Sequence, residues 1–345
     1  MGNKLLAALI VLLGWNGAAL AQTCSLPQVA DAVDLKPVPG TDMMTVPVEI
    51  NGTPKQFLLD VGTNVTEVSQ AAVTELGLPE TVKRTETITG QSGLTNGSLG
   101  SVSVVDVRDK TGAGGAQTKV RVASFTIGRA TSKSMMFLVA NDADMGKSSA
   151  EPYDGLLTGD FFKQYDVEID FGGKELNYLT PTRCTDPNQV VFWSHSAVAV
   201  IPIAMNDGKI SVPVSVQGHQ VNAVIDTSSS RTTMRRDVAE LIMGLKPDTP
   251  DMAPAGDLKD SKGLPVYDHI FSQISFAGGV TANNVPALIL TSTMTHQINK
   301  GAVLGSWARS ADAPVPDLTL GMDVLHQLHL YVVYGQKTLY VTGGE

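Results

Sequence analysis

Alternating apolar and polar residues along 43–50 predict a half-buried β-strand. Asn51-Gly52 is a strong hairpin signal, and the segment 56–59 after it, with the apolar run 57–59, is the predicted partner strand. This run ends in Asp60, and an acid beside a buried strand is costly unless it has a purpose. A second stretch repeats this order in the same register: a strand at 209–216, a turn at Gln217-Gly218, a strand at 221–225 and the acid Asp226.

A short helical pattern follows each acid and ends before a glycine, the residue that most readily adopts the left-handed conformation that closes a helix. We expect these helices at 69–76, before Gly77, and at 234–243, before Gly244. The ends of the two halves also match, because Asp160 and Asp323 each precede two apolar strands joined by a glycine-containing turn. Both the beginning and the end of the first half recur in the second half at a constant spacing. Chance similarity between β-rich segments does not explain this agreement.

The length of 345 residues and the duplication both favour two domains. We place the first at 36–181 and the second at 196–345, joined by a connector at 182–195. With 43% hydrophobic and 17% charged residues, the chain has enough apolar material for two packed cores. Its formal net charge of −9 and the lack of any basic run argue against nucleic acid as a partner.

Residues 1–21 have the layout of a cleavable secretory signal peptide. Lys4 precedes an apolar run at 5–13, and Ala19 and Ala21 supply the small residues of a cleavage site. The apolar run is too short to span a bilayer, and no later segment is long and apolar enough to do so. We therefore expect an exported protein without a membrane span, located in the periplasm or outside the cell.

Only two cysteines are present, Cys24 and Cys184. In an oxidising compartment an even number favours a disulfide, which would tie the mature N-terminus to the connector, and two unpaired thiols are the alternative. Two cysteines cannot form a structural zinc site. His326 and His329 are spaced to share a helix face, but without a His-Glu-x-x-His run we interpret them as surface histidines. We accordingly predict neither a metal nor a cofactor.

Each half carries an aspartate loop after an apolar strand and, much later, an apolar pair followed by an aspartate that opens a short helix. In these motifs the chain resembles the retropepsin-like and pepsin-like aspartic peptidases. The matching residues are 57–63 and 154–162 in the first half and 224–229 and 318–325 in the second. The resemblance implies an all-β-dominated fold of two tandem closed β-barrel lobes with short helices, which meet face to face across a cleft.

The resemblance makes Asp60 and Asp226 a catalytic dyad. Two carboxylates about 3 Å apart cannot both ionise, so the pair keeps one proton at neutral or mildly acidic pH. The ionised acid takes a proton from a bound water, the water attacks the peptide carbonyl, and the protonated acid donates to the developing oxyanion. Such a pair titrates as a unit.

The resemblance also implies four residues that contact the substrate or the acids: Gly62, Thr63, Thr227 and Ser229. The hydroxyls of Thr63 and Ser229 are each expected to hydrogen-bond a carboxylate, and the hydroxyl of Thr227 is expected to brace one loop against the other. Hairpins at 85–105 and 256–269 are candidate flaps over the cleft.

Three positions depart from the family pattern. Val61 has no bracing hydroxyl, Ser228 replaces a glycine whose missing Cβ lets the backbone approach its partner, and Thr158 replaces a tail glycine. We expect an aspartic endopeptidase that cleaves peptides or proteins. The alternative is a catalytically inactive protein that binds peptides in the same cleft. A monomer would hold both acids in one chain as an intramolecular pseudo-dimer, and pairing of like lobes in a homodimer is the other arrangement.

Overall fold

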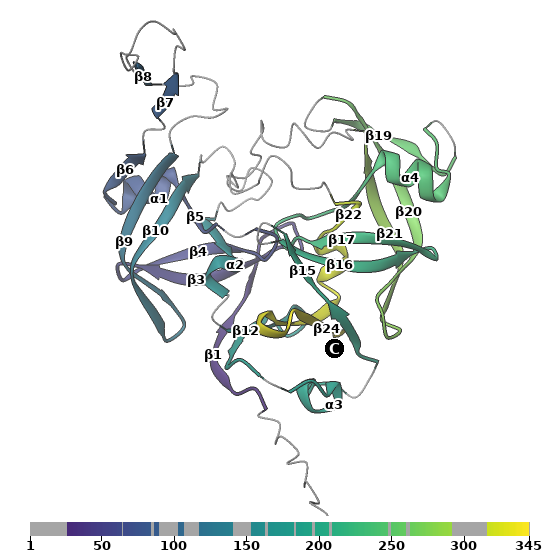
Figure 1. Ribbon diagram of the computed structural model, residues 1–345, viewed down its shortest axis with the longest axis horizontal. Helices are drawn as coiled ribbons and strands as arrows, with labels where there is room; N and C mark the ends of the chain where they lie inside the picture. Colours follow the sequence, from purple (N-terminus) through teal and green to yellow (C-terminus); the bar gives the residue numbers. More distant parts are fainter. Residues whose placement is uncertain are drawn as a thin grey trace, which may run out of the picture.

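The computed structural model describes residues 26–63, 65–83, 86–89, 103–106, 117–140, 153–162, 165–182, 184–194, 197–206, 209–247, 250–259, 263–291 and 316–344. Strands dominate this part of the chain, and its helices are short (Figure 1). The strands form three large sheets and one separate two-stranded hairpin. The predicted all-β-dominated fold class is therefore confirmed.

The first large sheet has the order β2-β3-β4-β11-β5-β10-β9-β6, and an additional pairing of β3 with β9 closes it into a barrel. We call this barrel the first lobe. Its buried centre includes the rings of Phe57, Phe125 and Phe137, whose centroids lie 4.9 to 6.3 Å apart. The strands are β2 (Lys36–Pro37), β3 (Met44–Ile50), β4 (Thr53–Asp60), β5 (Glu67–Ser69), β6 (Glu80–Lys83), β9 (Gln117–Ile127), β10 (Ala130–Ala140) and β11 (Gly155–Thr158).

The second large sheet repeats this order as β15-β16-β17-β22-β18-β21-β20-β19, and a pairing of β16 with β20 closes it in the same way. We call it the second lobe. The two lobes lie on opposite sides of the molecule in Figure 1. The strands are β15 (Ala204–Asn206), β16 (Lys209–Val216), β17 (His219–Ile225), β18 (Thr232–Arg235), β19 (Ala253–Lys259), β20 (Pro265–Ser275), β21 (Thr281–Leu290) and β22 (Leu318–Leu320).

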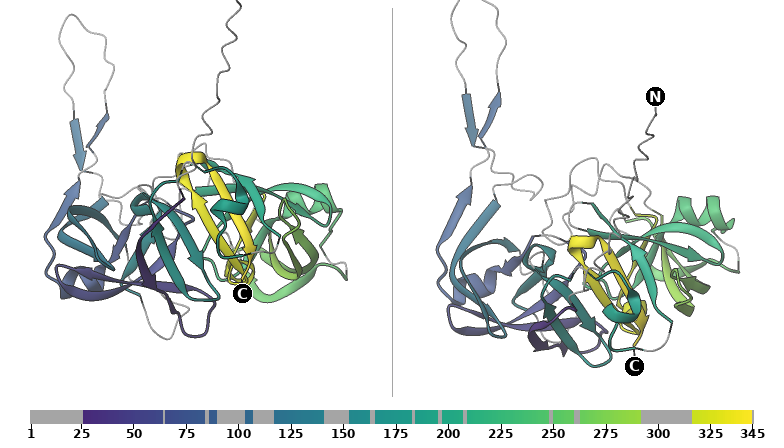
Figure 2. Two further views of the ribbon diagram at one scale, coloured as in Figure 1. Left: turned by 90° about the horizontal axis from the view of Figure 1, so that it is seen from below. Right: turned by 60° about the horizontal axis from the view of Figure 1, so that its bottom comes forward.

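A third, six-stranded sheet joins the halves beneath the two lobes (Figures 1 and 2). Its centre is an antiparallel pairing of β12 with β23, in which Val167 lies opposite Val332. Strands from both sides of the predicted connector therefore share one sheet. The domain limits at 36–181 and 196–345 stay a prediction. The order is β1 (Val29–Asp34), β13 (Glu175–Leu179), β12 (Asp166–Asp170), β23 (Leu328–Val333), β24 (Thr338–Gly343) and β14 (Ala199–Pro202).

The local elements form where the sequence pattern expects them. In the β3–β4 turn, Asn51 and Gly52 have φ angles of 52° and 81°, the twisted geometry that a two-residue hairpin requires. Gln217 and Gly218 repeat it between β16 and β17, at 49° and 89°. The two predicted helices are α1 (Gln70–Glu75) and α4 (Arg236–Met243), and the others are α2 (Gly159–Phe162), α3 (Pro187–Val190), α5 (Met322–Leu325) and the 3-10 turn η3 (Tyr334–Gln336).

Hairpins occupy both candidate flap regions. The first comprises β7 (Glu86–Thr89) and β8 (Ser103–Asp106), which stand away from the first lobe in Figures 1 and 2, and its remaining residues 90–102 lie outside the described part. The second comprises the facing ends of β19 and β20. No helix in the described residues is long and apolar enough to cross a membrane.

Candidate active site

Asp60 is the last residue of β4, at the point where this strand runs parallel to β11 in the middle of the first lobe. Its side chain is 0% exposed. The Gly62 amide donates to Oδ1 at 2.8 Å, and the Thr63 hydroxyl donates to Oδ2 at 2.8 Å. The bond from Thr63 is the one that the sequence leads us to expect. Each oxygen of this acid therefore has one donor from its own loop.

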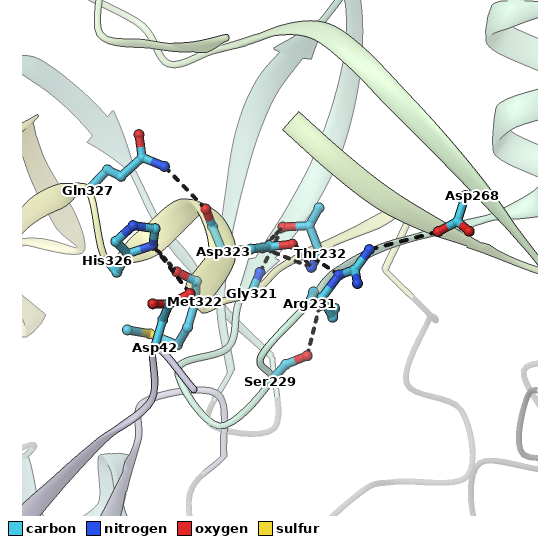
Figure 3. Close-up of polar contacts among 10 residues, drawn as sticks. All are labelled: Asp42, Ser229, Arg231, Thr232, Asp268, Gly321, Met322, Asp323, His326 and Gln327. Atoms are coloured by element: carbon cyan, nitrogen blue, oxygen red, sulfur yellow. Dashed lines mark hydrogen bonds and ion pairs between the residues drawn. The ribbon is translucent and has the colours of Figure 1, made fainter. Parts of the chain in front are cut away.

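Asp226 directly follows β17, the equivalent strand of the second lobe, and its amide donates to Leu320 O at 3.0 Å. Both donors to its side chain come from Ser228, whose amide and hydroxyl reach Oδ1 at 3.0 and 2.7 Å. The hydroxyl of Ser229 instead donates to the carbonyl oxygen of Arg231 at 2.9 Å (Figure 3). The prediction that Ser229 hydrogen-bonds this acid is therefore wrong, because its side chain is turned toward the loop backbone.

The two acid loops meet at Gly62. A Cβ atom at this position would lie 3.1 Å from Asp60 Oδ1 and 3.1 Å from Asp226 Cγ. It would also lie 3.2 Å from Asp226 Cα, so there is little room for a side chain. The two carboxyl groups thus flank a single point, and glycine is needed at 62 for this close approach.

Thr227 braces the loops against each other, as the resemblance implies. Its hydroxyl donates to Leu59 O at 2.7 Å and accepts from the Val61 amide at 3.1 Å. Thr227 is buried, so water does not compete for these bonds. Val61 holds the equivalent place in the first lobe, is also buried and has no hydroxyl to return the contact. The brace is therefore one-sided.

The environment of Asp60 favours its protonated form. Burial, and after it the nearby charge of Asp226, raise the pKa of Asp60 to about 7. The hydrogen bonds from Thr63 and Gly62 and the positive charge of Lys209 act in the opposite direction, but more weakly. A carboxyl group with this pKa holds its proton through the mildly acidic range and can serve as a general acid there.

In each half, the segment that opens the short helix near the end of the half hydrogen-bonds to the backbone of the acid loop. In the second lobe Met322 N donates to Ser229 O at 2.8 Å, and in the first Gly159 N donates to Thr63 O at 3.0 Å. Thr158, which departs from the family glycine, is buried with its hydroxyl 3.2 Å from that of Thr66. The first lobe thus keeps the supporting contact despite the substitution.

Gly321, the second-lobe equivalent of Thr158, has no room for a side chain, since a Cβ would lie 2.4 Å from the Arg231 backbone. Its amide donates to the Thr232 hydroxyl at 3.1 Å, and this hydroxyl donates to Asp323 Oδ1 at 2.6 Å. The Arg231 guanidinium lies 3.8 Å from both Asp268 and Asp323 (Figure 3). These contacts fix the segment that follows Asp226.

The structure therefore gathers five of the predicted site residues at the meeting point of the loops: Asp60, Gly62, Thr63, Asp226 and Thr227. The sequence prediction missed Ser228, although a hydroxyl residue two positions after an aspartate is a recognisable partner for its carboxylate. Cys184 lies within the predicted connector and is disulfide-bonded, while Cys24 lies outside the described residues, so their pairing stays a prediction.

The histidine prediction needs a correction. His329 is not a surface residue on a helix: it lies on β23, is buried, and its Nε2 donates to Glu168 Oε1 at 2.8 Å. His326 is half-exposed and bonds to the Met322 carbonyl (Figure 3). Among the described residues, no group of three or more histidine, cysteine, aspartate or glutamate side chains is placed to hold a metal ion.

Comparison with known proteins gives the family. A family model for aspartyl proteases matches residues 46–112 and 212–324, which are together more than half of the chain and include both acid loops. The chain belongs to the aspartyl protease family. No curated protein matches this aspartyl protease family member. The crystal structure of basic 7S globulin from soybean is similar to it, with a TM-score of 0.47 and 10% identity, over 91% of this chain and 97% of the globulin.

Proposed function

We propose that the protein is an exported aspartic endopeptidase that hydrolyses peptide bonds by activating water between Asp60 and Asp226. Membership of the aspartyl protease family supports the peptidase class. The observation that carries the dyad is the position of Gly62, where one point lies 3.1 Å from Asp60 Oδ1 and 3.1 Å from Asp226 Cγ. The charge of Asp226 also contributes to the raised pKa of Asp60, and in the proposed site the two acids share one proton, the state that acid–base hydrolysis needs.

In this mechanism a water molecule bound between the acids gives a proton to the ionised carboxylate as its oxygen attacks the peptide carbonyl carbon. The protonated carboxyl donates to the carbonyl oxygen, which neutralises the charge that develops on it. Thr63 and Ser228 orient the two acids through the bonds described above, and Thr227 fixes the distance between their loops. Peptides or proteins are the substrates.

The test is a peptide-cleavage assay of the wild type, Asp60→Asn and Asp226→Asn, with Asp34→Asn as a matched control because Asp34 is exposed on β1. We expect each dyad variant to lose about 10²–10⁴-fold in kcat/KM, which is the usual contribution of general acid–base catalysis. The control should cleave as the wild type does. Full activity in either dyad variant would rule out the proposed mechanism.

One observation favours a second candidate, a protein that binds peptides without cleaving them. The brace between the acid loops is one-sided, because Val61 returns no hydrogen bond to the second loop. A looser loop pair holds the acids less accurately, and small misplacements are costly for catalysis. Tight binding of an intact peptide from mildly acidic to neutral pH, with no cleavage, would support this candidate.

Export and the intramolecular dyad are parts of the same proposal. Removal of residues 1–21 would leave Gln22 as the first residue, which mass spectrometry of protein from the periplasmic or extracellular fraction would detect. A monomer that holds both acids keeps its specific activity on dilution, whereas a homodimeric site loses activity as it dissociates.

A further inference from the structure

A cavity of about 160 Å³ lies where β1, β13, α2 and the turn between β9 and β10 meet. Its lining residues belong to neither acid loop. The first residue of α2, Gly159, donates its amide to Thr63 O at 3.0 Å, whereas the third, Phe161, lines the cavity. The cavity is therefore a different site from the dyad.

Three aromatic rings line this cavity, those of Phe161, Tyr165 and Tyr178. The centroid of the Tyr178 ring lies 6.1 Å from that of Phe161 and 5.7 Å from that of Tyr165, with the planes inclined at 74° and 64°. Aromatic rings favour such edge-to-face contacts, so a further ring can join the cluster in the same way. A protein cavity of about 150 Å³ holds a benzene molecule. The size and the walls therefore suit a ligand with one aromatic ring.

Tyr178 also brings a polar group to the cavity. The residue is 2% exposed, and its hydroxyl has no hydrogen-bond partner among the described residues. Asp31 on β1 lies directly opposite Tyr178 on β13, so both side chains leave the same face of the sheet. After burial, Asp31 and Tyr165 are the groups that raise the pKa of Tyr178, and both line the cavity, which places the hydroxyl near it. A buried hydroxyl without a partner is costly, and a ligand with a hydrogen-bond acceptor would remove this cost.

The charged residues of the cavity neutralise each other. Asp31 is buried and accepts hydrogen bonds from the backbone amides of Ala32 and Arg129 and from Arg129 Nε, the last at 3.2 Å. The Arg129 side chain is 83% exposed, so it lies at the mouth of the cavity. A charged ligand would have to leave water without gaining an unpaired partner of opposite charge here, which favours an uncharged one.

We propose that this cavity is a binding site for a small, uncharged aromatic molecule that carries a hydrogen-bond acceptor. The ring of the ligand packs against Phe161, Tyr165 and Tyr178, and its acceptor takes a hydrogen bond from the Tyr178 hydroxyl. The proposal does not depend on the peptidase function, because it concerns residues outside the acid loops.

The test uses isothermal titration calorimetry of the full-length protein with phenol, and with toluene as the matched ligand that has no acceptor. We expect one phenol site with a Kd of about 1 mM or tighter. Tyr178→Phe removes only the hydroxyl, so it should weaken phenol binding about 3–10-fold and leave toluene binding unchanged. Ala30 is exposed and lines the cavity, so Ala30→Trp should block the mouth and abolish the binding of both molecules.

Ala32→Trp is the matched control, since Ala32 is an exposed residue of the same strand, and it should bind both molecules as the wild type does. If phenol does not bind the wild type, the cavity holds only water and the proposal is wrong. It is also wrong if Tyr178→Phe weakens phenol and toluene equally, or if benzoate or benzylamine binds more tightly than phenol. The comparison of phenol with toluene in Tyr178→Phe decides the site even if Ala30→Trp does not fold.

Discussion

At the residue scale, the buried acid of the first lobe makes stability depend on pH in a direction opposite to that of most aspartates. The pKa of Asp60 is raised from 3.8 to about 7 in the folded protein, so between these values the folded state binds more protons than the unfolded state. The contribution of Asp60 to the free energy of unfolding therefore falls as pH rises from about 4 to 7. Asp60→Asn cannot titrate, so denaturant unfolding at pH 4.5 and 7 should show a smaller loss of stability with pH in this variant. An identical pH dependence in both proteins would contradict the burial argument.

Residue identities in the acid loops were largely predictable from the sequence, and side-chain directions were not. The strand pattern placed Asp60 and Asp226 at strand ends, and the family motif indicated the contacts of Thr63 and Thr227. Ser228 and Ser229 are adjacent and chemically identical, so only the loop backbone decides which hydroxyl faces the acid. The burial of His329 depends in the same way on a sheet that local pattern does not reveal.

At the scale of elements, the relation between β4 and β17 depends on the hydroxyl of Thr227. Thr227→Val keeps the shape but leaves Leu59 O and the Val61 amide without this buried partner. An unsatisfied buried polar group costs about 1–3 kcal/mol, so we expect a loss of this size in the free energy of unfolding. A displaced dyad should also lower kcat more than it raises KM. Denaturant unfolding and steady-state kinetics measure the two effects.

Thr227→Ser is the matched variant, because it retains the hydroxyl and removes only a methyl group. It should recover most of the stability and activity that Thr227→Val loses. If valine and serine behave alike, packing rather than hydrogen bonding joins the loops. Hairpins and helix ends were predictable at this scale because their signals are local: Gly52, Gly218 and Gly244 all have positive φ where the sequence pattern required it.

At the scale of the whole molecule, two lobes were predictable from the duplication, but the sheet that joins them was not. The pairing of β12 with β23 brings together residues more than 150 positions apart, and each strand taken alone resembles any buried strand of a lobe. This sheet contains a buried carboxylate–imidazole pair, Glu168 with His329, and Trp193 stacks on the His329 ring at 4.4 Å between centroids. The link between the halves thus includes buried polar contacts, and a second one joins the Tyr331 hydroxyl to Asp166 Oδ2 at 3.3 Å.

Breaking the pair of Glu168 and His329 on one side should destabilise the link between the lobes. Glu168→Leu removes the acceptor of the buried His329 Nε2, and a buried polar group left without its partner costs about 1–3 kcal/mol. Glu168→Leu/His329→Leu removes both buried partners, leaves only the half-buried Asn177 amide without its Glu168 acceptor, and should regain a large part of that loss, since apolar replacements of buried pairs are often neutral. Denaturant unfolding of the wild type, both single variants and the double variant gives the coupling energy. A double variant less stable than either single one would mean that the pair joins the halves through its shape rather than through its hydrogen bond.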